Sequence, residues 1–328
     1  MSAGTESTGV ESPEVEPTEF VEQIRRVTLP DRIERLADEY DRLCGDRDRF
    51  LWRWIYSLFP EFTLTSVPDE HAAHVREQKT VLTMYVTALD DLVEHHGDRE
   101  TFEAARRLVR EPGAVDPGAA VDDDYFAFVE RAWRSFVDGL ADAPRFEEFV
   151  DVFQYDCRQT LNAMDYSAVV NENPRIANLG GAEHYDTHNM VMFPYADVDL
   201  MYSPGFDIAD FGTLRDLLWD LQEMARIGNW LTTWEREVAE GDYTAGIVVL
   251  ALQEGVVSPD ELEGAEADGE VVGRIKAADL ERRFRDRWAE RYRSVRDREF
   301  DTDSVDLDAL VAGMETVFQY HVASRGHK

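Results

Sequence analysis

Two short stretches of this sequence carry oxygen-bearing side chains at helical spacing. The first is the run VLTMYVTALDDLVEHHGD, which contains Asp90, Asp91 and Glu94. Residues four apart lie on one face of an α-helix, so Asp90 and Glu94 point the same way. Carboxylate oxygens are hard ligands of the kind that Mg²⁺ prefers. The run therefore predicts a metal-binding face, although a solvated acidic helix face would give the same pattern in so acidic a chain.

The second stretch is RIGNWLTTWEREVAEGDYTAG, in which Asn229, Thr233 and Glu237 follow one another at intervals of four. These side chains form one stripe that drifts only slightly over two helical turns. Their amide, hydroxyl and carboxylate oxygens are also hard ligands. Two such stripes, facing each other across a helical bundle, could hold several Mg²⁺ ions against a diphosphate group. An ordinary polar helix face is the competing interpretation of this second stripe.

The pair of motifs resembles those of the class I terpene synthases, of the bacterial or archaeal type. In that family an Asp-rich motif on one helix and an Asn-x-x-x-Ser/Thr-x-x-x-Glu motif on another flank the mouth of the active site. The run EREVAEGDYTAGIVVLALQEG also closely resembles the segment after the second motif in bacterial members. The resemblance implies an all-α, single-domain helical bundle, with three Mg²⁺ ions as cofactor and a prenyl diphosphate as substrate.

The function implied by the resemblance is that of a terpene synthase or cyclase. Such an enzyme ionises a linear prenyl diphosphate, here farnesyl or geranylgeranyl diphosphate, and yields a terpene hydrocarbon or alcohol plus diphosphate. A prenyltransferase on the same fold is a second hypothesis, but those enzymes usually carry two Asp-rich motifs and residues 229–237 are not one. A non-catalytic helical protein that binds isoprenoids is a third. Substrate chain length and product depend on cavity shape, which the sequence leaves open.

Two arginines near the second motif are candidates for stabilising the leaving diphosphate, in addition to Mg²⁺ acting as a Lewis acid. Arg236 precedes Glu237 and matches a basic residue that contacts the diphosphate in the family. Arg226 lies three residues before Asn229, on nearly the same helix face, and could assist. We therefore expect both arginines at the mouth of the site.

The segment GGAEHYDTHNMVMFPYADVDLMY departs from the family pattern. Bacterial members have a broken helix here, with an arginine that senses the diphosphate, a linking acid three residues later and a backbone carbonyl that triggers ionisation. By position, Glu183 or His184 falls near the arginine, and Asp186 and Thr187 fall near the linker and the trigger. No arginine occurs in this segment. His184 or His188 could substitute when protonated, and local hydrogen bonding is the competing role.

The C-terminus resembles the family imperfectly. Bacterial members end in a helix carrying an aromatic residue, then a serine, then an Arg-Tyr pair that closes on the diphosphate. Tyr320, Ser324 and Arg325 reproduce the first three, but Gly326 stands in place of the tyrosine. The resemblance implies that Tyr320 and Arg325 approach the substrate, whereas a frayed, solvated tail is the alternative.

A carbocation left by ionisation needs a dry cavity, because water would quench it. Residues one and two turns before the acidic motif are expected to line this cavity: Thr83, Met84, Val86 and Thr87. The run LWRWIYSLFPEF at 51–62 supplies aromatic faces that could stabilise cationic intermediates. Aromatic residues more often fill the core, so either role is open for this run.

Composition bounds the class of protein. The 328 residues are 44% apolar and 11% aromatic, which indicates a folded globular chain. The net charge of −34 and the restriction of lysine to Lys79, Lys276 and Lys328 favour a halophilic source, whose salt-rich cytoplasm would screen self-repulsion. The sequence contains no basic stripe that could bind the phosphates of a nucleic acid. It also contains no apolar run that approaches the length of a membrane span. We expect a cytoplasmic protein, either a monomer or a homodimer.

Helical periodicity runs through nearly the whole chain after an acidic N-terminal segment. Residues 1–18 are expected to form a disordered tail and residues 19–328 one helical domain. The Pro- and Gly-rich residues 111–121 predict a loop, and residues 255–275 predict a second connector. The expected helices are 18–27, 31–44, 47–58, 70–95, 99–110, 122–139, 145–170, 207–240, 243–254, 276–295 and 305–324.

Overall fold

The computed structural model describes residues 17–45, 47–110, 115–116, 118, 121–263 and 269–327. Within these ranges the regular structure is helical and contains no strand, so the predicted all-α fold is confirmed. The predicted tail lies outside the described residues as far as residue 16, and the first helix begins at Pro17. Most of the loop predicted for 111–121 also lies outside them.

The described residues form a succession of helices along the chain. The first part of the chain forms α1 (Pro17–Arg25), α2 (Asp31–Leu43), α3 (Arg49–Leu58), α4 (Asp69–Glu94), α5 (Arg99–Ala105), α6 (Asp123–Gly139) and α7 (Phe146–Glu172). The second part forms α8 (Leu179–His184), α9 (Met192–Met201), α10 (Phe211–Glu240), α11 (Gly246–Gln253), α12 (Pro259–Glu263), α13 (Gly269–Ala277), α14 (Leu280–Arg296) and α15 (Leu307–Ala323). Short 3₁₀ segments are η1 (Phe59–Phe62), η2 (Arg106–Val109), η3 (Pro174–Ile176), η4 (Asp186–Met190) and η5 (Ile208–Asp210).

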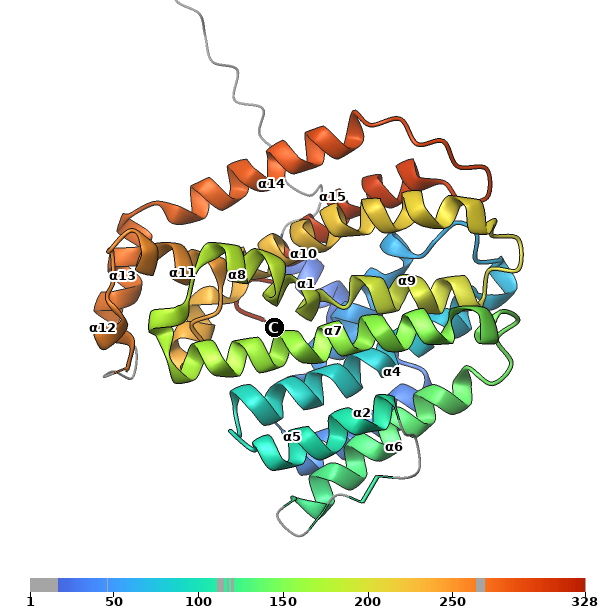
Figure 1. The fold of residues 1–328 in the computed structure, drawn as a ribbon, viewed down its shortest axis with the longest axis horizontal. Coiled ribbons are helices and arrows are strands. Elements are labelled where there is room, and N and C mark those ends of the chain that lie inside the picture. The colour runs from blue at the N-terminus through green and yellow to red at the C-terminus, as the bar shows by residue number, and fades with distance from the viewer. Residues whose placement is uncertain are drawn as a thin grey trace, which may run out of the picture.

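Helices α4 and α10 carry the two predicted motifs and lie within the bundle (Figure 1). Helix α4 packs against α3, α6, α7 and α9, while α10 packs against α9, α11, α14 and α15. Because neighbours cover each helix on several sides, their buried apolar residues are not confined to one stripe. Met84 and Leu89 of α4, and Trp230 and Trp234 of α10, have no measurable exposure. Polar side chains on such helices must therefore pair internally or face a cavity.

The segment before α10 is a broken helix, as the resemblance implied. It comprises α8, η4 and α9, and the break between η4 and α9 falls at Val191, whose φ of 57° is left-handed. A β-branched residue rarely adopts this conformation, which costs about 1–2 kcal/mol. Periodicity did not predict these helices, because each is short and α9 is buried along its whole length. The connector predicted for 255–275 likewise contains α12 and most of α13.

A buried ion pair joins α4 to α9. Lys79 and Asp199 are both fully buried, and Lys79 Nζ lies 2.7 Å from Asp199 Oδ2. Burial raises the pKa of Asp199 to about 6 and lowers the pKa of Lys79, because each charged form loses its hydration. Removing either partner would leave a buried charge without its counter-charge, so the pair locks these two helices together.

No helix in the described ranges has the length and apolar character needed to cross a lipid bilayer.

Candidate active site

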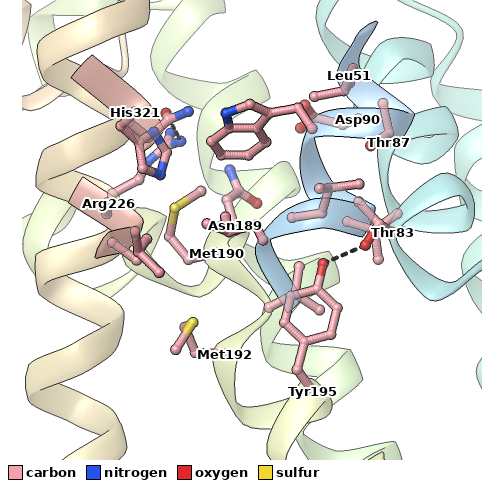
Figure 2. A pocket seen from close by; sticks show the side chains of 18 of the residues that line it. Leu51, Thr83, Thr87, Asp90, Asn189, Met190, Met192, Tyr195, Arg226 and His321 are labelled. Atoms are coloured by element: carbon pink, nitrogen blue, oxygen red, sulfur yellow. Dashed lines mark hydrogen bonds between the residues drawn. The ribbon is translucent and has the colours of Figure 1, made fainter. Parts of the chain in front are cut away.

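One pocket brings together residues from both predicted motifs. Its cavity volume is about 200 Å³, and its walls include Asp90 and Glu94 of α4 together with Asn229 and Glu237 of α10. These residues are far apart in the sequence and share a pocket only because the bundle places α4 and α10 around it. Figure 2 shows Asp90 and Arg226 on opposite walls of this pocket.

The α4 wall follows the helical spacing that the sequence predicted. Thr83, Val86 and Thr87 line the cavity below Asp90, as expected. Met84 does not line it and is fully buried in the core, so this prediction was wrong. Met84 is one residue from Thr83, and successive residues of a helix point about 100° apart.

Asp91 belongs to a different environment from Asp90. It is fully buried and is not part of the pocket wall. Its Oδ2 accepts a hydrogen bond of 2.5 Å from the Tyr40 hydroxyl, and its Oδ1 accepts one of 2.8 Å from Arg47 Nε. Both oxygens are thus engaged by protein donors, and Asp91 positions Arg47. Arg47, which sequence patterns did not single out, lines the pocket.

The α10 motif presents its carboxylate to the pocket. Glu237 is only 8% exposed, and its Oε2 is buried without a hydrogen-bond partner among the described residues. Asn229 also lines the pocket, and its Oδ1 accepts a hydrogen bond of 2.8 Å from Arg226 Nη1. Thr233 is buried behind them, and its hydroxyl donates to the carbonyl oxygen of Asn229 at 2.8 Å. Thr233 itself is not part of the pocket wall.

A second carboxylate follows the end of α10 and was missed by motif spacing. Helix α10 ends at Gly241, whose φ of 86° is a left-handed conformation that glycine adopts readily. The chain therefore turns back, and Asp242 N donates to the carbonyl oxygen of Glu237 at 2.8 Å. Asp242 lines the pocket beside Glu237. In the sequence, the position of Asp242 directly after a glycine that ends the motif-bearing helix was the one feature that could have indicated it.

The carboxylates at the pocket are crowded. Burial raises the pKa of Asp90 to about 7, opposed by Arg47, and Asp91 raises it further. Burial also raises the pKa of Glu237 to about 7, and the neighbouring Asp242 adds to the shift. Burial and the neighbouring Asp90 raise the pKa of Glu94 well above its ordinary value. Because desolvation and mutual repulsion both disfavour these anions, a bound cation would stabilise them.

The donor set at the pocket fits Mg²⁺ in combination with a phosphate-bearing ligand. Among the described residues, no three His, Cys, Asp or Glu side chains converge closely enough to hold an ion by themselves. Two pocket-lining oxygens, Glu237 Oε2 and Asn189 Oδ1, are nevertheless buried without hydrogen-bond partners. Both are acceptors that a cation can satisfy. Mg²⁺ is commonly held by one or two carboxylates, with phosphate oxygens and water completing its octahedron.

Arg226 is the pocket-lining cation of α10, and Asp186 of η4 holds it. Arg226 Nε and Nη2 each donate a 2.7 Å hydrogen bond to Asp186, which is fully buried. Trp230 Nε1 donates to Asp186 at 3.2 Å, and Asn189 Nδ2 donates at 3.1 Å. The linking acid implied by the resemblance therefore contacts an arginine, but the arginine comes from α10 and not from the broken helix.

The histidines considered as substitutes for the missing arginine lie away from the pocket. His184 is exposed, and its Nδ1 is 2.7 Å from the carbonyl oxygen of Gly180. His188 packs with its ring 5.3 Å from that of Trp219, and burial lowers its pKa. Neither histidine lines the cavity. The structure therefore does not bring either histidine to the pocket wall, and contact of His184 with the diphosphate stays a prediction.

Three other predicted residues also lie outside the pocket wall. Arg236 forms an ion pair with Glu240, and its Nη2 is 3.9 Å from Glu237 Oε1. Arg325 Nη2 donates to Glu281 at 2.7 Å. Tyr320 packs its ring edge-on against another aromatic ring, 4.7 Å away on α1.

Helix α15 reaches the pocket through other residues than those predicted. His321 and Val317 line the cavity, and the His321 ring lies 5.0 Å from that of Trp54. Tyr320 and His321 are adjacent, so about 100° of helical rotation separates the two side chains. The family-like spacing thus identified a helix that lines the pocket, and His321 rather than Tyr320 lies in the pocket wall.

The pocket wall also has a large apolar part. The α3 and η1 segments contribute Leu51, Trp54, Ile55, Leu58 and Phe62, so part of the predicted aromatic run lines the cavity. The broken helix contributes Met190, Val191, Met192 and Tyr195. The Tyr195 and Thr83 hydroxyls hydrogen-bond to each other at 2.7 Å (Figure 2). Such a pocket combines ionic ligands with an apolar wall.

Comparison with known proteins agrees with this geometry. A search of curated proteins finds no match. The family model for terpene synthase family 2, C-terminal metal binding, matches residues 82–262, more than half of the chain. The matched range includes both motif-bearing segments, from Asp90 on α4 to Glu237 on α10. This chain therefore belongs to the terpene synthase family.

Proposed function

We propose that this protein is a Mg²⁺-dependent terpene synthase or cyclase that ionises farnesyl or geranylgeranyl diphosphate to a terpene hydrocarbon or alcohol and diphosphate. The observation that carries the proposal is the convergence of Asp90, Glu94, Asn229 and Glu237 on one pocket that also has apolar walls. Glu237 Oε2, which has no hydrogen-bond partner in the described part of the chain, supports a cation beside it. The family match supports the general type of function.

The residues proposed to hold three Mg²⁺ ions are Asp90 and Glu94 on one wall and Asn229, Thr233 and Glu237 on the other. When bound, the ions would supply Lewis-acid stabilisation of the leaving diphosphate. The Thr233 hydroxyl donates its proton to the carbonyl oxygen of Asn229, which leaves its oxygen lone pairs for an ion. Asn229 would exchange the hydrogen bond from Arg226 for an ion.

The chain's own groups would then act on the two products of carbon–oxygen bond cleavage. The diphosphate leaves with the electron pair of the broken bond. Arg226, released from Asn229 but still held by Asp186, would donate a hydrogen bond from Nη1 to it. The allylic cation would remain in the apolar part of the pocket. Trp54 and Phe62 present aromatic rings there, and the apolar walls exclude the water that would quench the cation.

The broader features of the chain are proposals of the same kind. We propose that residues 19–328 form one catalytic domain behind an acidic tail, in a monomer or homodimer. The acidic, lysine-poor composition supports a cytoplasmic protein from a salt-rich cell, because salt would screen the net charge of −34.

The direct test is incubation of the full chain with Mg²⁺ and ten-, fifteen- or twenty-carbon prenyl diphosphates, with and without molar KCl. Diphosphate release together with a hydrocarbon or alcohol product supports the proposal. Longer diphosphates as products would indicate a prenyltransferase, and unchanged substrate would indicate binding without catalysis. Glu237→Gln should lower turnover by about 100-fold or more, because it removes an anionic ligand at nearly constant volume.

Glu240→Gln is the matched control for that variant. Glu240 lies on the same helix and pairs with Arg236 outside the pocket wall. Its turnover should stay at the wild-type level. Equal activity of the Glu237 and Glu240 variants at limiting Mg²⁺ would show that the second motif does not bind metal.

A further inference from the structure

We propose that Arg47 is a diphosphate-binding residue that acts from the wall opposite Arg226. The inference rests on the proposed function and adds a residue to the site. Arg47 and Arg226 are the arginines among the described residues of the pocket wall. The surrounding carboxylates favour cations here, and a diphosphate brings further negative charge that ions alone need not neutralise.

The backbone around Arg47 places its side chain over the acidic motif. Arg47 lies between α2 and α3, directly before Asp48, the N-cap of α3. Asp48 Oδ1 accepts a 2.7 Å hydrogen bond from Phe50 N, which holds the start of the helix. The Arg47 side chain is only 12% exposed. Arg47 is therefore largely buried within the pocket wall and is not an exposed surface arginine.

The hydrogen bonds of Arg47 leave one end of its guanidinium group available. Nε donates to Asp91 Oδ1 at 2.8 Å, and Nη2 lies 2.7 Å from the same oxygen. Nη2 is also 3.9 Å from Asp90 Oδ2. Within the described residues, Nη1 donates to no protein acceptor. Arginine has five N–H donors in a rigid plane, so a group held at one end can bind a phosphate oxygen at the other.

Arg47 and Arg226 are held in the same manner. Each is fixed by a fully buried aspartate, Asp91 for Arg47 and Asp186 for Arg226. Each also lies beside a proposed metal ligand, Asp90 or Asn229. The buried aspartates keep both guanidinium groups oriented without occupying all their donors. A diphosphate bound between the two motifs would therefore meet one positioned arginine from each side.

The competing role for Arg47 is to neutralise Asp91 and nothing more. The two roles differ in a measurable quantity, the affinity for inorganic diphosphate in the presence of Mg²⁺. Loss of a charge-assisted hydrogen bond to phosphate should weaken that affinity by at least about 10-fold. A purely structural role would change thermal stability and leave the affinity of the folded protein unchanged.

The experiment is calorimetric titration of the full chain with inorganic diphosphate at saturating Mg²⁺. Arg47→Gln should bind at least about 10-fold more weakly than wild type, and Arg47→Lys should fall between them because it keeps the charge. Arg215→Gln is the matched control, because Arg215 holds the buried Asp156 through hydrogen bonds of 2.7 and 3.0 Å outside the pocket. It should bind diphosphate as wild type does.

Arg47→Gln with Asp91→Asn keeps the test valid if the single variant does not fold, since it removes the buried charge along with its partner. Wild-type affinity in this double variant, or in Arg47→Gln, would overturn the inference and leave the proposed function standing. Absence of diphosphate binding by the wild-type chain would instead overturn the proposed function.

Discussion

Arg226 and Asp186 are joined by two hydrogen bonds of 2.7 Å between α10 and η4, and both side chains are buried. This pair connects the metal-binding helix to the broken helix that precedes it. Burial alone would lower the pKa of Arg226, but Asp186 reverses the effect, so the pKa lies above the ordinary arginine value. Burial raises the pKa of Asp186 and Arg226 opposes that shift, so the charge of each partner depends on the other.

The first prediction concerns that dependence. Asp186→Asn should lower the free energy of unfolding by about 3–5 kcal/mol, because it leaves Arg226 buried without its counter-charge. Arg226→Gln should be similarly costly. Combining both substitutions should cost clearly less than the sum, because no isolated charge remains. Urea denaturation of the four proteins measures this, and strictly additive losses would contradict the coupling.

The second prediction concerns pH. Asp197 of α9 is almost fully buried, and burial followed by the neighbouring Asp156 raises its pKa well above the ordinary value. The folded state therefore holds this proton more tightly than the unfolded chain, so stability is lost as the pH rises above about 4. Asp197→Asn removes that loss. The variant should match wild type near pH 4 and exceed it in stability by a margin that grows as the pH rises towards 8.

Unfolding measured at intervals from pH 4 to pH 8 gives the difference between the Asp197 variant and wild type. A constant difference across this range would show that Asp197 titrates normally in the folded protein.

The third prediction tests close packing beside the site. A Cβ atom at Gly246 would lie 2.6 Å from Trp230 Cζ3. Gly246→Ala should therefore destabilise the fold by about 1–3 kcal/mol through overpacking. Displacement of Trp230 should also disturb its 3.2 Å hydrogen bond to Asp186 and weaken Mg²⁺–diphosphate binding.

Gly273→Ala is the control for the Gly246 variant. Gly273 lies within α13, and a Cβ atom there would have nothing within 4 Å. This substitution should stabilise the protein by about 0.5–1 kcal/mol through helix propensity. If both alanine variants melted at the same temperature, the contact with Trp230 would not restrict position 246.

The fourth prediction separates Thr233 from its neighbour. We expect Thr233→Val to raise the Mg²⁺ concentration for half-maximal turnover by about 10–100-fold, because it removes a proposed ligand oxygen while keeping the side-chain shape. Thr232→Val removes a hydroxyl that donates to the carbonyl oxygens of Gly228 and Asn229. The Mg²⁺ requirement of that control should stay near the wild-type value. Equal requirements in the two variants would exclude Thr233 as a ligand.

What the sequence could predict is what one helix determines alone. Asp90 and Glu94 share a pocket wall, as do Asn229 and Glu237, because a spacing of four residues fixes their relative direction. Neighbours in sequence were less well predicted. Arg236 is next to Glu237 but is rotated by about 100°, which brings it to Glu240 instead of the pocket.

Contacts between helices were beyond the reach of sequence spacing. Arg47 reaches Asp91 only because α2, α3 and α4 pack together, and no periodicity links positions 47 and 91. Arg226 was named as a cation near the second motif, but its pairing with Asp186 depends on how η4 packs on α10. The missing arginine of the broken helix could be noticed in the sequence, while the arginine that meets Asp186 could be found only in three dimensions.

Because Lys79 is buried against Asp199, its chemical modification can report how often α4 and α9 separate. The amine of Lys276 is half-exposed, whereas that of Lys79 has no contact with solvent. An amine-reactive reagent should therefore modify Lys276 in the native protein and reach Lys79 only when α4 and α9 separate. The ratio of the two modification rates, followed by mass spectrometry, would report how often this part of the bundle opens and whether a bound ligand holds it shut.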